Sequence, residues 1–78
     1  MNIMEANLNS IHIFKTNIKK IEPDCAMRKN LDNHLDIQHW SIDLEDVDCV
    51  LRVVSESLKP EKIISIVNMF GYYCQELP

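Results

Sequence analysis

The apolar residues of this chain repeat with two different periods, which together predict four β-strands and two α-helices. Four short segments either alternate between apolar and polar residues or are rich in β-branched and aromatic types. The predicted strands are residues 10–16, 37–44, 49–55 and 72–77. An alternating strand has one face for a core and one for solvent. The core-facing residues predicted from this alternation are Ile11, Ile13, Trp40, Ile42, Leu51 and Val53.

Two segments with helical spacing separate these strands. The first predicted helix begins at Pro23, a residue favoured in the first turn, and fades near Asp36. Its apolar face consists of Met27, Leu31, His34 and Leu35. The second begins at Pro60 and ends before Gly71, the one glycine, which suits a left-handed residue after a helix. Its apolar stripe, at i, i+3, i+4 and i+7, consists of Ile63, Ile66, Val67 and Phe70.

The resulting order is β-α-β-β-α-β, preceded by a weakly docked tail at residues 1–9. One apolar face per element fits two helices packed on one side of a four-stranded antiparallel sheet. Right-handed crossovers then place the first and third strands at the centre. We therefore predict an α+β, ferredoxin-like domain over residues 10–78. Because this fold carries many unrelated functions, only the site can decide among them.

Composition excludes two classes of partner. Nucleic-acid binders draw much of their affinity from basic side chains on phosphates, whereas this chain has a net charge of −4 and no basic stripe. No apolar run is long enough to span a bilayer. The N-terminal residues also lack the basic start and apolar block of a secretory signal. We expect a cytoplasmic protein with reduced thiols, without nucleic-acid or membrane partners.

The sequence offers no set of catalytic residues. It has no Ser/His/Asp or Cys/His constellation and no glycine-rich phosphate loop. The histidines His12, His34 and His39 have no ligand spacing, and the acidic residues between Asp43 and Asp48 are typical of a solvated turn. We therefore expect no enzyme activity and no bound cofactor.

Four blocks of sequence together carry a resemblance to a known family. They are Lys15-Thr16-Asn17-Ile18-Lys19, Trp40, Asp43-Leu44-Glu45-Asp46 and Gly71-Tyr72. With these blocks, the segment from Ile11 to Leu77 resembles the heavy-metal-associated (HMA) domain family, which includes small copper chaperones and repeats of copper-pumping ATPases. The resemblance is strongest to a bacterial subgroup and implies the same ferredoxin-like fold.

In metal-binding members of that family, two cysteines three residues apart hold Cu(I) at the start of the first helix. The matching positions in this chain are Lys20 and Pro23, so the resemblance implies a degenerate metal loop. Cys25 lies two residues further on and supplies at most one thiolate. Lys20 places an ammonium where relatives hold a metal cation, or is an ordinary solvated lysine. Tyr72 matches a position beside the metal loop and is expected to pack on the core.

Two hypotheses of different kinds follow. The first is a non-catalytic interaction module that keeps the chaperone fold without its metal and binds itself or an unknown protein. The alternative is a weak metal-handling protein that uses Cys25 for Cu(I) or Zn(II), with a second thiolate supplied across a homodimer. Cys49 and Cys74 are expected to be buried small hydrophobes.

The interaction surface expected for the first hypothesis is the sheet face left bare by the helices, or the edge strand beside it. Alternation assigns to this face His12, Phe14, Val50, Arg52 and Val54. Apolar patches on small domains often mark contact sites. The opposing interpretation is a small inert patch that Arg52 and the N-terminal tail partly cover. A Cu(I) or Zn(II) titration under reducing conditions discriminates between the two functions.

Overall fold

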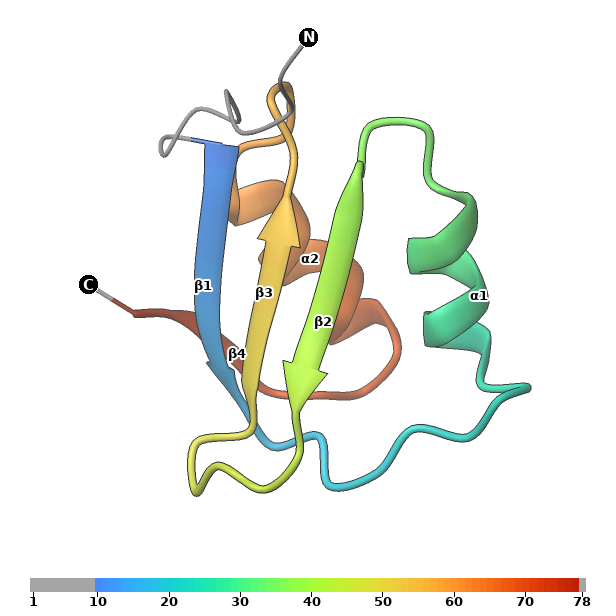
Figure 1. Cartoon of the computed structure of the whole chain (residues 1–78), viewed down its shortest axis with the longest axis vertical. Coiled ribbons are helices and arrows are strands. Elements are labelled where there is room, and N and C mark those ends of the chain that lie inside the picture. Colours follow the sequence, from blue (N-terminus) through green and yellow to red (C-terminus); the bar gives the residue numbers. More distant parts are fainter. Residues whose placement is uncertain (1–9, 78) are drawn as a thin grey trace, which may run out of the picture.

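The structure is a computed structural model that describes residues 10–77, so the tail predicted at residues 1–9 lies outside the described part. Its elements follow the predicted order (Figure 1): β1 (Ile11–Thr16), α1 (Ala26–Asn33), β2 (His39–Asp43), β3 (Val50–Val54), α2 (Pro60–Met69) and β4 (Cys74–Glu76). The antiparallel sheet has the strand order β2-β3-β1-β4, with β1 and β3 at the centre. This is the ferredoxin-like α+β topology, which confirms the prediction.

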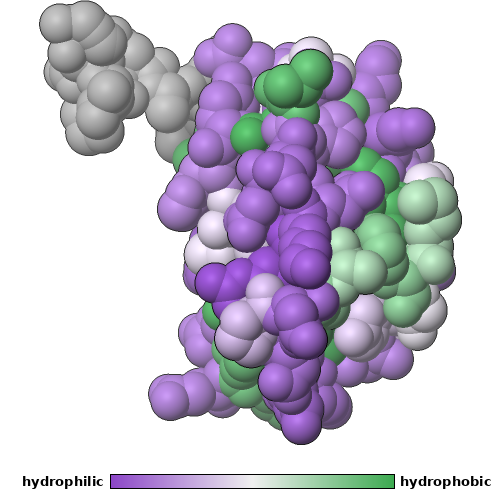
Figure 2. Space-filling model, turned by 90° about the vertical axis from the view of Figure 1, so that its right-hand side faces the viewer, coloured by the Kyte–Doolittle hydropathy of each residue, from purple (hydrophilic) through white to green (hydrophobic). Residues whose placement is uncertain are grey.

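The core lies between the sheet and the two helices. In Figure 1, α2 lies behind the sheet, α1 lies beside β2, and the other face of the sheet is turned to the viewer. The sheet contributes its inward residues, α1 contributes Met27 and Leu31, and α2 contributes three residues of its predicted stripe. Figure 2 shows the side of the molecule on which α1 lies, and the surface there is mostly hydrophilic. Among residues 10–77, no helix is both long and apolar enough to cross a bilayer.

The predicted facing of β1 is wrong. Phe14 is fully buried and Ile13 is 36% exposed, so Phe14 and His12 point to the helices while Ile11 and Ile13 point to the open face. The run Ile-His-Ile-Phe is apolar in both alternations, and a one-residue shift moves every side chain to the other face. The structure continues the alternation of Phe14 through Thr16 to Ile18, all buried, and thereby places the largest apolar side chain inside.

The predicted start of α1 is also wrong. Pro23 lies in a turn, closed by a 3.0 Å hydrogen bond from the Cys25 N–H to the Glu22 carbonyl, and the helix begins only at Ala26. Proline is well suited to the second residue of such a turn. At the other end the helix stops at Asn33, and the predicted apolar-face residue Leu35 is 98% exposed.

The second helix agrees with its prediction. Pro60 is its first residue, and Lys59 at the N-cap makes no side-chain capping bond. Ser55, which is buried, stabilises the segment before the helix, because its Oγ accepts a 3.0 Å hydrogen bond from the Leu58 N–H. Gly71 follows the helix with a φ of 90°, a conformation that residues with a Cβ rarely adopt.

The facing of β1 can be tested by unfolding experiments. Phe14→Ala should lower the free energy of unfolding by about 3–5 kcal/mol, because it leaves a cavity in the core. Ile13→Ala, on the exposed face of the same strand, should cost about 1 kcal/mol or less. Urea titrations followed by Trp40 fluorescence give both values. Equal losses, or a larger loss at Ile13, would contradict the observed facing.

Candidate functional site

Three loops meet at the end of the sheet where β1 finishes, in the lower part of Figure 1. They are the β1–α1 loop (residues 17–25), the β2–β3 loop (44–49) and the α2–β4 loop (70–73). The Thr16 N–H donates to the Asp48 carbonyl at 3.0 Å, and the Tyr73 N–H donates to Asn17 Oδ1 at 2.8 Å. These bonds tie the start of the β1–α1 loop to both neighbouring loops.

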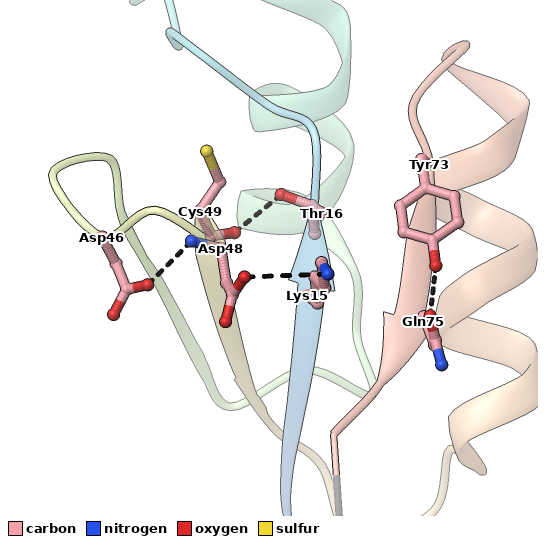
Figure 3. A network of polar contacts seen from close by, with 7 residues as sticks. All are labelled: Lys15, Thr16, Asp46, Asp48, Cys49, Tyr73 and Gln75. Atoms are coloured by element: carbon pink, nitrogen blue, oxygen red, sulfur yellow. Dashed lines mark hydrogen bonds and ion pairs between the residues drawn. The ribbon is translucent and has the colours of Figure 1, made fainter.

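Thr16 is the residue that joins the loops from the inside. Its hydroxyl donates to the Cys49 carbonyl at 2.7 Å (Figure 3). The same hydroxyl accepts from the Ile18 N–H at 3.2 Å. The side chain is 5% exposed, so these bonds satisfy a polar group that burial would otherwise penalise. Cys49 takes part with its backbone alone, and Figure 3 shows its sulfur pointing away from the Asp48 carboxylate.

The acidic residues of the β2–β3 loop form turns. Asp43 Oδ1 accepts from the Glu45 N–H at 3.1 Å, and Asp46 Oδ1 accepts from the Asp48 N–H at 2.8 Å. Asp side chains commonly stabilise turns by bonding the backbone two residues on. Lys15 Nζ lies 3.8 Å from Asp48 Oδ1, but an ion pair this exposed contributes little. The run is therefore a folding feature, as the solvated-turn interpretation predicted.

Lys20 and Pro23, the two positions that the sequence resemblance matched to metal ligands, are both exposed. Lys20 Nζ lies 3.0 Å from Glu22 Oε2, and the two side chains are 77% and 56% exposed. The ammonium thus forms a local surface pair within its own loop. Pro23 is exposed on the adjoining turn, whereas Tyr72, on a neighbouring loop, is half-buried and packs against the core as expected.

The three thiols differ in environment, and all are free. Cys25 is half-buried at the N-cap of α1 and makes no side-chain capping bond. Cys49 is 2% exposed and has a φ of 45°, while Cys74 is 8% exposed. Burial raises the pKa of the Cys74 thiol to about 11, so it stays protonated at neutral pH. Cys49 and Cys74 are buried, which confirms that prediction.

The donor set does not fit a bound Cu(I) ion. Soft metals are held by thiolates, but Lys20 offers an ammonium and Pro23 offers no donor at all. No group of three or more His, Cys, Asp or Glu is placed to hold a metal within residues 10–77. Of the described buried side-chain polar atoms, His12 Nε2 alone lacks a hydrogen-bond partner. His12 lies four residues before Thr16, about 13 Å away along the strand from the junction of the three loops.

A groove between α1 and β2 was not expected from the sequence. Its volume is about 530 Å³, and Trp40 Nε1 donates to Asp32 Oδ1 at 2.8 Å across it. Its lining includes six consecutive residues, 37–42. The groove depends on where α1 begins and ends, and the spacing of apolar residues predicted both ends of this helix wrongly.

Comparison with known proteins adds no assignment to this geometry: no family model matches the chain, and neither a curated protein nor a solved structure gives a significant match.

Thiol labelling tests the three cysteine environments. In the native protein at pH 8, Cys25 should be alkylated first, and Cys49 and Cys74 should react at least tenfold more slowly, because thiolate character and access both control reactivity. Mass spectrometry after timed quenching locates the label, and urea-unfolded protein gives the control rates. Comparable native rates at all three positions would contradict the burial described above.

Metal competition tests the loop. We expect no one-to-one Cu(I) complex that withstands a chelator competitive with a two-thiolate site, because Cys25 stands alone there. Cys25→Ser should leave the weak residual binding within about twofold of wild type. As a positive control, the variant Lys20→Cys/Pro23→Cys restores the spacing of the HMA pair. Tight binding by the wild type that Cys25→Ser abolishes would support the metal alternative instead.

Proposed function

We propose that this chain is a non-catalytic, HMA-like protein-interaction module without the metal-binding cysteine pair, and that the open face of its sheet docks a partner protein. One observation carries the proposal: on the helix-free face, the two central strands place the exposed apolar residue Ile13 directly opposite the exposed cation Arg52.

The open face has a different composition from the one expected. Phe14 and His12, which were expected on this face, point to the helices, and Ile11 and Ile13 lie on it instead. The residues of β3 keep their predicted side: Arg52 is exposed, while Val54 and Val50 are half-buried and 6% exposed, respectively. The apolar part of this face therefore consists of Ile13 together with Ile11 and Val54, which stand opposite each other.

The charge of this face indicates the chemistry of the partner. Although the chain is acidic overall, Arg52 and Lys15 stand on the two central strands beside Ile13. Within the described residues, Lys15 pairs with Asp48 at 3.8 Å and Arg52 has no carboxylate within ion-pairing distance. A surface that presents apolar side chains next to carboxylates would satisfy both features.

The metal-handling alternative has no comparable support. It requires a second thiolate from another copy beside Cys25, yet Cys25 is half-buried against the core. The described part of the chain also brings no histidine or carboxylate cluster to this thiol. We therefore put forward the interaction function alone.

Site-specific photo-crosslinking tests the docking face. A photo-reactive residue at Ile13 should give a defined adduct in cells of the source organism, whereas the same residue at Lys29, on the solvent side of α1, should not. Once that partner is purified, Arg52→Glu should weaken its binding at least tenfold, and Met69→Ser, a change at an exposed position on α2, should leave it unchanged. Equal adducts from both positions, or binding indifferent to Arg52→Glu, would refute the docking face.

A further inference from the structure

The strand β2 has one unpaired edge, because it lies at the end of the sheet order. The Val54 carbonyl accepts a 2.8 Å hydrogen bond from the Gln38 N–H, so the polar backbone groups of Val54 face β2. These groups alternate sides along a strand, so those of Arg52 face β2 as well. Arg52 stands opposite Ser41, whose groups therefore face β3. The groups left on the free edge are the N–H and C=O of Trp40 and Ile42.

This edge has only part of the protection that edge strands usually have. Lysine, proline, bulges and a covering helix or loop commonly prevent edges from pairing, and here α1 lies beside β2 with the groove between them (Figure 1). The β2 sequence His-Trp-Ser-Ile-Asp contains neither lysine nor proline. The groove beside it is lined both by Ser41, which points to the open face, and by Trp40 and Ile42, which point to the helices. Residues from both faces can line one groove only if the groove runs along the strand edge.

The five residues of β2 are complementary to themselves when read in the opposite direction. In an antiparallel pair centred on Ser41, His39 of one copy stands opposite Asp43 of the other, and Trp40 stands opposite Ile42. Opposite-charge pairs and aromatic–β-branched pairs are both favourable across strands. Asp43 uses Oδ1 for its own turn, which leaves Oδ2 to accept from the imidazole. His39 and Asp43 share the open face, and Trp40 and Ile42 share the helix side, so both kinds of pair form in one register.

We propose that two copies of this chain form a twofold dimer in which their β2 edges pair antiparallel about Ser41. Trp40 and Ile42 of each copy then exchange backbone hydrogen bonds with Ile42 and Trp40 of the other, and the two sheets become one. A contact in which residue i meets j while j meets i is the arrangement that twofold symmetry requires. The bond from Trp40 to Asp32 holds the indole on the helix side, next to the joint.

The partner at this edge is a second copy of the chain, because its β2 strand supplies an Asp43 opposite His39 and a His39 opposite Asp43. A strand from another protein could bond the same backbone groups, but it would need a basic and an acidic residue at the same two positions. The dimer depends on the edge and the proposed docking function on the open face. Substitutions on the two surfaces therefore separate the two proposals.

Amide exchange reports on the edge directly. At protein concentrations where sedimentation velocity shows dimer, the N–H groups of Trp40 and Ile42 should exchange at least tenfold more slowly than in dilute protein. The N–H of Ser41, already bonded to β3, should change less than twofold. A chain that stays monomeric at every accessible concentration, or a dimer that leaves the Trp40 and Ile42 rates unchanged, would overturn the proposal.

Charge reversal tests the register. His39→Glu places two carboxylates opposite each other at both ends of the joint and should raise the dimer dissociation constant about tenfold or more. The double variant His39→Glu/Asp43→Lys restores opposite charges and should return the constant to within about threefold of wild type. Ser65→Glu adds the same charge on α2, and Ile13→Ser alters the open face; neither should matter. Loss of the dimer in Ile13→Ser, or failure of the double variant to restore it in folded protein, would overturn the edge pairing.

Discussion

The pairing of Phe14 with Leu51 at the centre of the sheet is the contact on which the remaining geometry depends. Both side chains are fully buried, and they lie on the two central strands. Once Phe14 points to the helices, alternation sends Ile13 to the open face and Thr16 into the loop junction. The same strand therefore determines the composition of the open face, the hydrogen bonds that join the loops and the unpartnered position of His12 Nε2.

The chemistry of the loop end follows from what Thr16 binds. Its hydroxyl and N–H both bond the β2–β3 loop, and Ile18 fills the space beneath the β1–α1 loop. Backbone carbonyls and the side chain of Ile18 therefore lie on the inner side of this loop, and Ile21 and Cys25 also pack against the core, while Lys20 and Glu22 form an exposed pair outside it. The polar groups of Thr16 are satisfied by the loops themselves, whereas the edge of β2 leaves backbone groups unpaired.

The sequence predicted those features that a strong period specifies. The stripe of α2, the left-handed Gly71 and the order of strands were all predicted, because each depends on a repeated or chemically singular signal. The facing of β1 was predicted wrongly because both alternations of that strand are apolar, so only three-dimensional packing decides between them. The turn at Pro23 was missed because proline suits a turn and a helix start equally well. Cys25, Lys20 and Tyr72 could be placed on their loops, but the groove at β2 depends on where α1 ends.

The exposed edge of β2 has its origin in the length of α1. Residues 17–25 form a loop, and the helix that follows has eight residues. Such a helix is about 12 Å long, whereas the five-residue strand beside it spans about 17 Å. With only Met27 and Leu31 buried, α1 anchors on the core without extending along the whole strand. The long β1–α1 loop and the short helix after it thus leave the neighbouring strand partly uncovered, and a partly uncovered strand whose sequence complements itself is a surface suited to a second copy.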